Sequence, residues 1–285
     1  MHLHTAKRKI SLGAPVVMGI LNVTPDSFSD GGRFADLDAA LRRAEEMISE
    51  GAAIIDIGGE STRPGSERVP AAIEIDRVVP IIEAIGSRFD VPISIDTSKA
   101  EVAEAAVEAG AEIINDISGL RFDERIADVA ARTKAGLVLM HSRGSFETMH
   151  SQPPVADILE EVSNDFRRSI AIAEERGVSR DAIVLDIGIG FGKTLEQNLE
   201  LLGKLDRIAD TFKAFPLLVG ASRKSLIGKI LDGAPPDARL SGSLAAAVIA
   251  VLNGATIIRV HDVRQTVEAL KVGVAIETNR RRAIS

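Results

Sequence analysis

The stretch from residue 16 to residue 57 begins with the apolar run VVMGIL and ends with the apolar run AIIDI. Between them, residues 37–51 read LDAALRRAEEMISEG, with apolar side chains at helical spacing and Gly51 as a stop signal. Those apolar side chains are Leu37, Leu41, Ala44 and Ile48. The stretch therefore predicts a strand, an amphipathic helix and a second strand, which is the repeating unit of a parallel α/β fold.

The same unit recurs along the whole chain. The apolar runs cover residues 16–21, 53–57, 92–95, 113–114, 136–140, 183–185, 217–219 and 257–258. The helix-like segments cover residues 37–51, 73–85, 100–109, 124–133, 155–175, 195–208, 225–231 with 241–252, and 266–277. An open doubly wound sheet would need G-x-G-x-x-G after the first strand, and VMGILNVTPDS has no such motif. Eight units instead predict a (β/α)8 TIM barrel of the α/β class.

The 285-residue chain shows no linker rich in Ser, Gly or Pro, so we expect a single domain. The predicted barrel covers residues 16–279. Residues 1–15 precede it as an N-terminal extension, and residues 280–285 follow it as a basic C-terminal tail.

The composition narrows the classes of function. A hydrophobic fraction of 45% and a charged fraction of 26% are typical of a soluble globular protein. The net charge of −7 gives no overall attraction to nucleic acid, and the absence of cysteine excludes disulfides, thiolate nucleophiles and cysteine metal sites. No apolar run approaches the ~20 residues that span a bilayer, and the start of the chain lacks a signal-peptide pattern. We therefore expect a cytoplasmic protein with no membrane or nucleic-acid partner.

Polar side chains stand at or just beyond the end of each apolar run. They are Asn22, Asp56, Asp96, Asn115, His141, Asp186, Ser222, Arg223, Lys224, Arg259 and His261. Since parallel strands joined by helices deliver their carboxyl ends to one face, these side chains should converge on one mouth. A single strand-end Asp could equally be a helix N-cap, but three on one pit favour a binding site.

The loops after the first two runs differ in how much they indicate. In ILNVTPDSFSDGGRF, at residues 20–34, Asn22, Asp26 and Asp30 are oxygen donors that a plain turn would also use. In DIGGESTRPGSE, at residues 56–67, small residues free the backbone to approach a ligand, and Arg63 supplies a fork for a phosphate or carboxylate. The second loop therefore indicates an anion site.

Seven segments closely resemble the signature segments of the dihydropteroate synthase family, in the right order. They are LNVTPDSFSDGG, GGESTRPGS, SIDTSK, NDISG, DIGIGFGK, GASRKS and RVHDV, and the resemblance extends from Val16 to Val263. It implies a (β/α)8 barrel that condenses 6-hydroxymethyl-7,8-dihydropterin pyrophosphate with p-aminobenzoate. The products would be pyrophosphate and 7,8-dihydropteroate, a precursor in folate biosynthesis.

The resemblance also implies roles for individual residues. The pterin would be bound by Asp96, Asn115, Asp186 and Lys224. The diphosphate would be surrounded by Asn22, Thr62, Arg63, Arg259 and His261, with Mg²⁺ held partly by Asn22. The p-aminobenzoate pocket, where sulfonamides would bind, would include Phe28, Pro64 and Ser225. Dimerisation through the outer helices, as a homodimer, is a further expectation from the family.

Physical reasoning supports these roles at several points. Strand-end carboxylates such as Asp96 and Asp186 can accept the paired N–H groups of a pterin edge, and Asn115 offers both a donor and an acceptor. Arg259 and His261 alternate with Val260 and so point to one side, where a buried guanidinium needs an anion.

The resulting mechanism draws the leaving group away and stabilises a cationic pterinylmethyl group. The catalytic candidates are Asp96, Asp186, Lys224, Arg259 and His261, and Asp30 belongs to a loop expected to close over the site.

Some features depart from the family or stay open. Ile187 stands where most members of the family have Pro. A Walker loop ending in GKT would need Gly at position 187, so GIGFGKT does not complete that motif. His141 could serve the site or pack the barrel top. Two other functions remain: a folate-dependent corrinoid methyltransferase barrel, which would have little use for Arg63, Arg259 and His261, and a noncatalytic pterin-binding paralogue.

Overall fold

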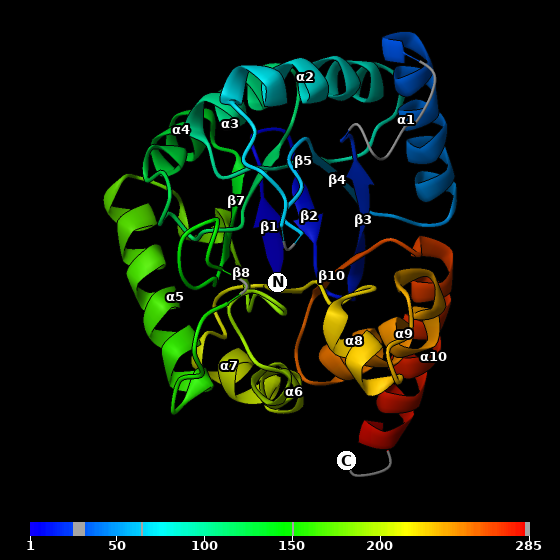
Figure 1. The fold of residues 1–285 in the computed structure, drawn as a ribbon. Coiled ribbons are helices and arrows are strands. Elements are labelled where there is room, and N and C mark those ends of the chain that lie inside the picture. Colours follow the sequence, from blue (N-terminus) through cyan, green and yellow to red (C-terminus); the bar gives the residue numbers. More distant parts are fainter. Residues whose placement is uncertain (25–31, 64, 150, 283–285) are drawn as a thin grey trace.

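The computed structural model describes residues 1–24, 32–63, 65–149 and 151–282. Within them, eight parallel strands form a closed barrel in chain order, and the last strand pairs with the first (Figure 1). The strands are β3 (Val16–Asn22), β4 (Ile54–Gly58), β5 (Ile93–Asp96), β6 (Ile113–Asp116), β7 (Gly136–Met140), β8 (Ile183–Asp186), β9 (Leu217–Val219) and β10 (Ile257–Val260). The predicted TIM barrel is confirmed.

Helices surround the barrel and follow the strands as predicted (Figure 1). They are α1 (Gly32–Ser49), α2 (Ala71–Arg88), α3 (Ala100–Glu108), α4 (Arg125–Thr133), α5 (Ile158–Glu175), α6 (Leu195–Gly203), α7 (Leu205–Thr211), α8 (Ser225–Ile230), α9 (Leu240–Leu252) and α10 (Val263–Arg282), with 3₁₀ turns at Arg180–Ala182 and Pro236–Ala238. The helix expected over residues 195–208 is two helices, which meet at Lys204. None of the described helices combines the length and apolarity needed to cross a membrane.

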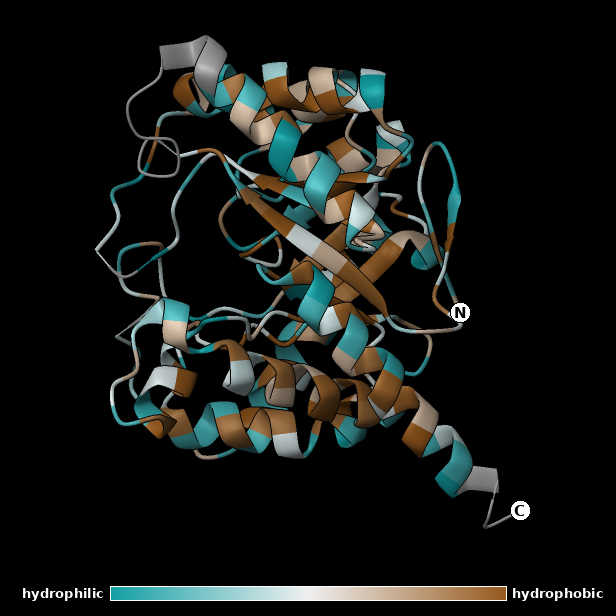
Figure 2. Cartoon of the chain, turned by 90° about the vertical axis from the view of Figure 1, so that its right-hand side faces the viewer, coloured by the Kyte–Doolittle hydropathy of each residue, from teal (hydrophilic) through white to brown (hydrophobic). Residues whose placement is uncertain are grey.

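Two layers of inward-facing side chains explain why the site lies at one end of the barrel. The lower layer is apolar and consists of Met18, Ile54, Ile113, Val138, Val184, Leu218 and Ile257. Since side chains alternate along a strand, the next inward position lies two residues further on. On β4, β6, β8 and β10 that position holds Asp56, Asn115, Asp186 and Arg259. The barrel interior therefore changes from apolar to polar side chains toward the carboxyl ends of the strands. Figure 2 shows the largely hydrophobic strands among helices of mixed character.

The N-terminal residues close the other end of the barrel. β1 (His2–His4) and β2 (Lys9–Ser11) form an antiparallel hairpin. Its side chains Leu3 and Ile10, with Leu12 after it, are buried against the lower apolar layer. Residues 1–15, expected as an extension, thus contribute to the core of the barrel.

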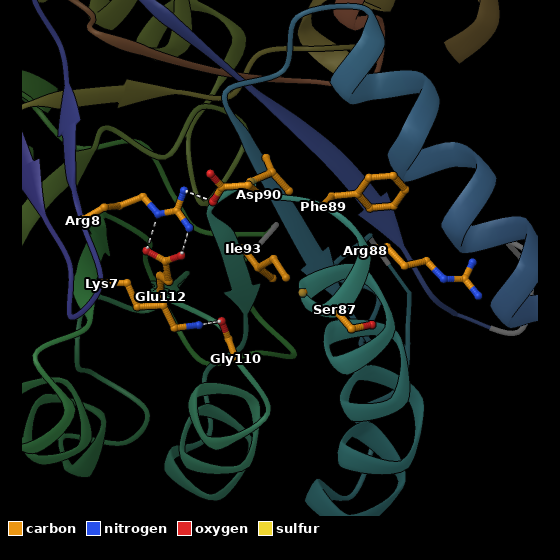
Figure 3. A pocket seen from close by; sticks show the side chains of 11 residues that line it. Lys7, Arg8, Ser87, Arg88, Phe89, Asp90, Ile93, Gly110 and Glu112 are labelled. Carbon is orange, nitrogen blue, oxygen red and sulfur yellow. Dashed lines mark hydrogen bonds and ion pairs between the residues drawn. The ribbon is translucent and has the colours of Figure 1, made fainter.

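Ion pairs hold this hairpin in place, as Figure 3 shows. Arg8 donates from Nε to Glu112 Oε2 at 3.1 Å and from Nη1 to Asp90 Oδ1 at 2.8 Å. Lys7 Nζ donates to the carbonyl of Gly110 at 2.8 Å. Glu112 is almost fully buried, so losing its partner Arg8 would leave a costly buried charge. A polar hollow of about 400 Å³ lies beside these residues, at the amino ends of the strands.

The basic residues expected as a C-terminal tail from residue 280 begin within a helix. α10 continues to Arg282, and Arg280 pairs with Glu277 one turn earlier, at 2.8 Å from Nε to Oε2. Opposite charges three residues apart on a helix stabilise it, so this part of the predicted tail is helical.

We expect Leu3→Ala to destabilise the protein by about 2–5 kcal/mol, because it leaves a cavity under the lower apolar layer. Thermal or denaturant unfolding measures the effect. His2→Ala, on the exposed side of the same strand, is the matched control and should change stability by less than about 0.5 kcal/mol. Equal melting temperatures for the two variants would contradict the role of the hairpin in the core.

Candidate active site at the carboxyl ends of the strands

The centre of the polar layer is one guanidinium between two carboxylates. Arg259 on β10 donates from Nε to Asp56 Oδ2 at 2.6 Å and from Nη2 to Asp96 Oδ2 at 2.5 Å. The Asp56 side chain is fully buried, and those of Asp96 and Arg259 are 15% and 18% exposed. The anion that a buried Arg259 requires is therefore supplied within the protein, by two strands from the opposite part of the chain.

Asn115 extends this network and leaves an acceptor free. Its Nδ2 donates to Asp56 Oδ2 at 3.2 Å, which fixes the orientation of the amide. Asn115 Oδ1 and Asp56 Oδ1 are buried and have no hydrogen-bond partner among the described residues. Because buried polar atoms are nearly always satisfied, these two oxygens indicate where a ligand with N–H groups would bind.

Asp186 and Lys224 stand on the other side of the pit. Asp186 Oδ1 accepts from the backbone N–H of Gly188 at 2.8 Å. Lys224 Nζ donates to the carbonyl of Ile189 and lies 4.6 Å from the centre of the Phe191 ring. The end of β8, the loop after it and the residue before α8 therefore bring a carboxylate, an aromatic ring and an ammonium group together.

Lys193 holds that loop in its curled shape. Its Nζ donates to the carbonyls of Gly188 at 2.7 Å and Phe191 at 3.0 Å. Gly188 has a φ of +61°, and a Cβ there would lie 1.8 Å from the carbonyl oxygen of His141. Only glycine fits at this position. Ile187, which we expected to depart from a Pro common in the family, is fully buried in the main core.

His261 and its neighbours form the edge near β9 and β10. Its Nδ1 lies 3.1 Å from Ser222 Oγ, which also accepts the backbone N–H of His261 at 3.2 Å. Arg223 is turned to Asp262 and donates to both of its carboxylate oxygens. The charge of Arg223 is thus paired within the protein.

Burial shifts the pKa values of the charged groups in the pit. It raises the pKa of Asp96 to about 7, with Arg259 opposing the shift and Asp56 adding to it. Burial lowers the pKa of Lys224 to about 8, although Asp186 opposes this. Burial and the nearby Arg259 lower the pKa of His261 to about 4, so its imidazole is neutral near pH 7. The pKa of Asp186 is raised by burial.

The remaining predicted residues lie at the rim or beyond the described part. Thr62 is half-buried and Arg63 is exposed, in the loop after β4. Arg63 is one of the charges that lower the pKa of His261, so it faces the same edge of the pit. Ser225 is exposed at the first position of α8. Phe28, Asp30 and Pro64 fall outside the described residues.

His141 is buried above β7, and its contact with the loop after β8 is through the backbone. Its carbonyl accepts from Lys193 Nζ at 3.3 Å. Burial, and then the charge of Lys193, lower the pKa of its ring well below the usual value. Its ring Nδ1 is buried and has no hydrogen-bond partner among the described residues, as is also true of Asn115 Oδ1.

One residue and one apolar cluster belong to the site although the sequence analysis gave them no role in it. Asp56, noted only as a strand-end residue, is the central acceptor of the network. A carboxylate inside the run AIIDI was its only signal. Beside the pit lies an apolar cluster of Ile117, Met140, Phe146, Met149 and Phe191. Its members come from the end of β7 and from several loops, so no spacing in the sequence brings them together.

The described residues contain no cluster of three His, Asp or Glu side chains that could hold a metal ion. Asn22 and Asp96 flank Gly58, where a Cβ would lie 3.8 Å from Asn22 Oδ1 and 3.7 Å from Asp96 Oδ2. Because Asp96 Oδ2 already accepts from Arg259, Asn22 Oδ1 is the candidate ligand for an ion at this position. Since Mg²⁺ commonly takes one or two protein oxygens and the rest from phosphates and water, the site fits an ion that arrives with a diphosphate.

Comparison with known proteins agrees with this geometry. The sequence profile described as "Pterin binding enzyme" matches residues 18–261. The dihydropteroate synthase of Synechocystis is 49% identical over 260 residues, covering 91% of this chain and 89% of the relative. That of Escherichia coli K12 is 49% identical over 274 residues, 95% of each chain.

Solved structures give the same result. The Yersinia pestis dihydropteroate synthase, in complex with a sulfonamide drug, superposes with a TM-score of 0.91 at 46% identity, over 98% of this chain and 100% of that one. The Xanthomonas albilineans dihydropteroate synthase with 4-aminobenzoic acid gives 0.90 at 42% identity, over 97% and 98%. The chain therefore belongs to the family of pterin-binding enzymes, among the dihydropteroate synthases.

Proposed function

We propose how the residues of the pit divide the work of the dihydropteroate synthase reaction. This chain is a transferase that condenses 6-hydroxymethyl-7,8-dihydropterin pyrophosphate with p-aminobenzoate in folate biosynthesis. The bond between the pterin methylene carbon and the pyrophosphate oxygen breaks, and a bond from that carbon to the amine nitrogen forms. The amine loses one proton, and the products are 7,8-dihydropteroate and pyrophosphate.

The pterin binds in the polar layer, with its ring edge toward Asp96, Asn115 and Asp186. The observation that carries this assignment is the buried, unsatisfied Oδ1 of Asn115, which suits a ring N–H donor. The carboxylates of Asp96 and Asp186 accept hydrogen bonds from further N–H groups and stabilise the positive charge that develops on the ring. Lys224 offers donors on the same side, and the apolar cluster suits the flat face of the ring.

The diphosphate lies toward the rim, where Thr62, Arg63 and His261 face it. The imidazole of His261 is neutral in the free enzyme and adds no formal charge. With Ser222 Oγ donating to Nδ1, the ring proton lies on Nε2, which can then donate to the diphosphate. Arg259 uses Nε and Nη2 on the two carboxylates and would offer its remaining N–H groups to the leaving group, and Arg63 supplies an exposed cation. Positive groups at this end favour departure of the negatively charged leaving group.

Mg²⁺ would be held by Asn22 together with the diphosphate oxygens, and it would neutralise charge on the leaving group.

We expect Mg²⁺ alone to bind with negligible heat, and Mg²⁺ with pyrophosphate to bind measurably in isothermal titration calorimetry. Asn22→Ala should weaken the second titration because it removes the protein oxygen. Strong binding of Mg²⁺ alone, or no effect of the substitution, would contradict this assignment.

The second substrate enters from the rim. p-Aminobenzoate would lie with its carboxylate near Ser225, at the start of α8. Phe28, Pro64 and Asp30, which the family resemblance adds to this pocket and its loop, fall outside the described residues. The amine of p-aminobenzoate is neutral at working pH, so its attack needs no strong general base. The Xanthomonas relative was solved with 4-aminobenzoic acid and the Yersinia relative with a sulfonamide drug, which supports sulfonamides as ligands of this pocket.

The two other functions are less well supported. The similarity to dihydropteroate synthases covers more than nine-tenths of the chain, and the charges of Arg63 and Arg259 both act on His261, so a corrinoid methyltransferase has no support. A noncatalytic paralogue is tested by kinetics alone.

The direct test mixes the protein with dihydropterin pyrophosphate, p-aminobenzoate and Mg²⁺ and follows both products by chromatography. Stoichiometric dihydropteroate and pyrophosphate are expected. Pterin binding without release of pyrophosphate would favour the noncatalytic paralogue.

The pKa values of the pit predict the pH dependence of kcat/KM for the pterin substrate. It should rise near pH 7 as Asp96 becomes a carboxylate and fall above about pH 8 as Lys224 loses its proton. Asp56→Asn removes a negative charge that raises the pKa of Asp96, so the acid limb should move to lower pH. Asp206→Asn on the surface is the control. An acid limb that does not move in Asp56→Asn would refute the assignment.

The proposed partners are the two small-molecule substrates and a second copy of this chain. α9 and α10 present exposed apolar side chains to the outside: Ile249, Leu252, Val272 and Ile276. The two helices approach closely, because a Cβ at Gly273 would lie 2.9 Å from a methyl group of Val248. An apolar surface continuous over two helices suits an interface between copies. We place the enzyme in the cytoplasm, since its charged substrate would not cross a bilayer unaided.

We expect light scattering after size exclusion to give twice the chain mass for the wild type. Val272→Asp should give the mass of one chain, because a carboxylate at the centre of the surface loses hydration on association. Leu199→Asp, at an exposed apolar residue on α6, is the matched control and should stay dimeric. A wild type with the mass of one chain would contradict the homodimer.

A further inference from the structure

A buried ion cluster lies at the base of the loop that carries Thr62 and Arg63. Lys99, which ends the segment SIDTSK after β5, places its Nζ 2.7 Å from Glu60 Oε1 and 2.5 Å from Glu74 Oε2. The three side chains are 12%, 6% and 0% exposed. Neither pterin binding nor diphosphate binding, as assigned above, uses any of them.

Glu60 joins the two ends of the loop. Its Oε1 accepts from Lys99 and also from the backbone N–H of Val69, at 2.5 Å. Residues 60 and 69 bracket the segment 61–68, so one carboxylate oxygen ties both of its ends to the end of β5. Within the segment, Ser66 Oγ donates to the carbonyl of Ser61 at 2.6 Å.

α2 supports the cluster from behind. Glu74, in its first turn, is fully buried, and a Cβ at Gly59 would lie 3.0 Å from Glu74 Cγ. Arg77 Nη1 donates to the carbonyl of Gly59 at 2.8 Å. The residue before Glu60 is therefore fixed by packing and by a hydrogen bond, and the base of the loop has little freedom.

The stability of the fold alone does not explain why charged side chains occupy this buried position. Two carboxylates share one ammonium group, and burial raises the pKa of Glu74 although Lys99 lowers it. Buried ion pairs lose hydration, and apolar side chains of similar volume often stabilise a protein as well or better. What the ions add is direction, because each hydrogen bond fixes one element relative to another.

We propose that Lys99, through Glu60 and Glu74, positions segment 61–68 so that Thr62 and Arg63 face the diphosphate. Lys99 is a positioning residue: it touches no substrate and acts through the loop. The inference rests on the proposed function, in which Thr62 and Arg63 bind the diphosphate. Lys99→Met removes the ammonium group and keeps most of the side chain's volume.

Two readouts test the position of the loop. In Lys99→Met, the KM for dihydropterin pyrophosphate should rise at least about tenfold, because small displacements of binding groups are costly. Trypsin should also cut faster between Arg68 and Val69, since the N–H of Val69 loses its fixed acceptor. Lys99→Arg, which keeps the charge, should recover part of both effects.

The control is Lys204→Met, which breaks a Lys–Glu pair of the same 2.7 Å length that is exposed at the end of α6. It should change neither readout. Should Lys99→Met fail to fold in a thermal melt, Lys99→Met with Glu74→Met removes one charge of each sign and should give the same two effects.

The proposal is overturned if Lys99→Met, or Lys99→Met with Glu74→Met, folds and keeps the wild-type KM for dihydropterin pyrophosphate. Arg63→Ala then locates the failure. If Arg63→Ala raises this KM, the cluster of Lys99, Glu60 and Glu74 does not position the loop. If Arg63→Ala also leaves it unchanged, the proposed diphosphate role of the loop is wrong.

Discussion

The guanidinium of Arg259, held between Asp56 and Asp96, is the interaction on which the site depends. It links β10 to β4 and β5 across the barrel interior. Removing the cation would leave Asp56 charged and fully buried, and removing the carboxylates would leave a buried cation. The same arrangement orients Asn115, because the acceptor that binds Arg259 also binds the amide.

The barrel allows such a network because its two ends are chemically different. At the amino ends of the strands, the hairpin and the lower apolar layer form a dry core. At the carboxyl ends, the next inward positions carry charge, and burial shifts the pKa values of Asp96 and Lys224 toward neutrality. Small changes in the charge of neighbouring groups therefore change which proton states are present at working pH.

Much of this could be predicted from the sequence, because period-2 strands and period-3.6 helices alternate so regularly. The barrel follows from the eight apolar runs, and the convergence of Asp96, Asn115, Asp186, Lys224 and Arg259 follows from their position after those runs.

The rest depends on contacts that local patterns do not encode. The hairpin strands are three residues each, too short for a periodic signal. The Asp56–Arg259 pair joins residues 203 positions apart. The curl after β8 needs a left-handed Gly188 and three carbonyls gathered by Lys193, which the motif alone does not specify.

A double-mutant cycle on Arg259 and Asp56 tests the central claim most directly. The free energy of unfolding is measured for Arg259→Met, Asp56→Asn and the double variant. Arg259→Met alone should cost about 3–5 kcal/mol, because it leaves Asp56 buried and unpaired. Adding Asp56→Asn should recover a large part of this loss. Effects that add within about 0.5 kcal/mol would contradict the account.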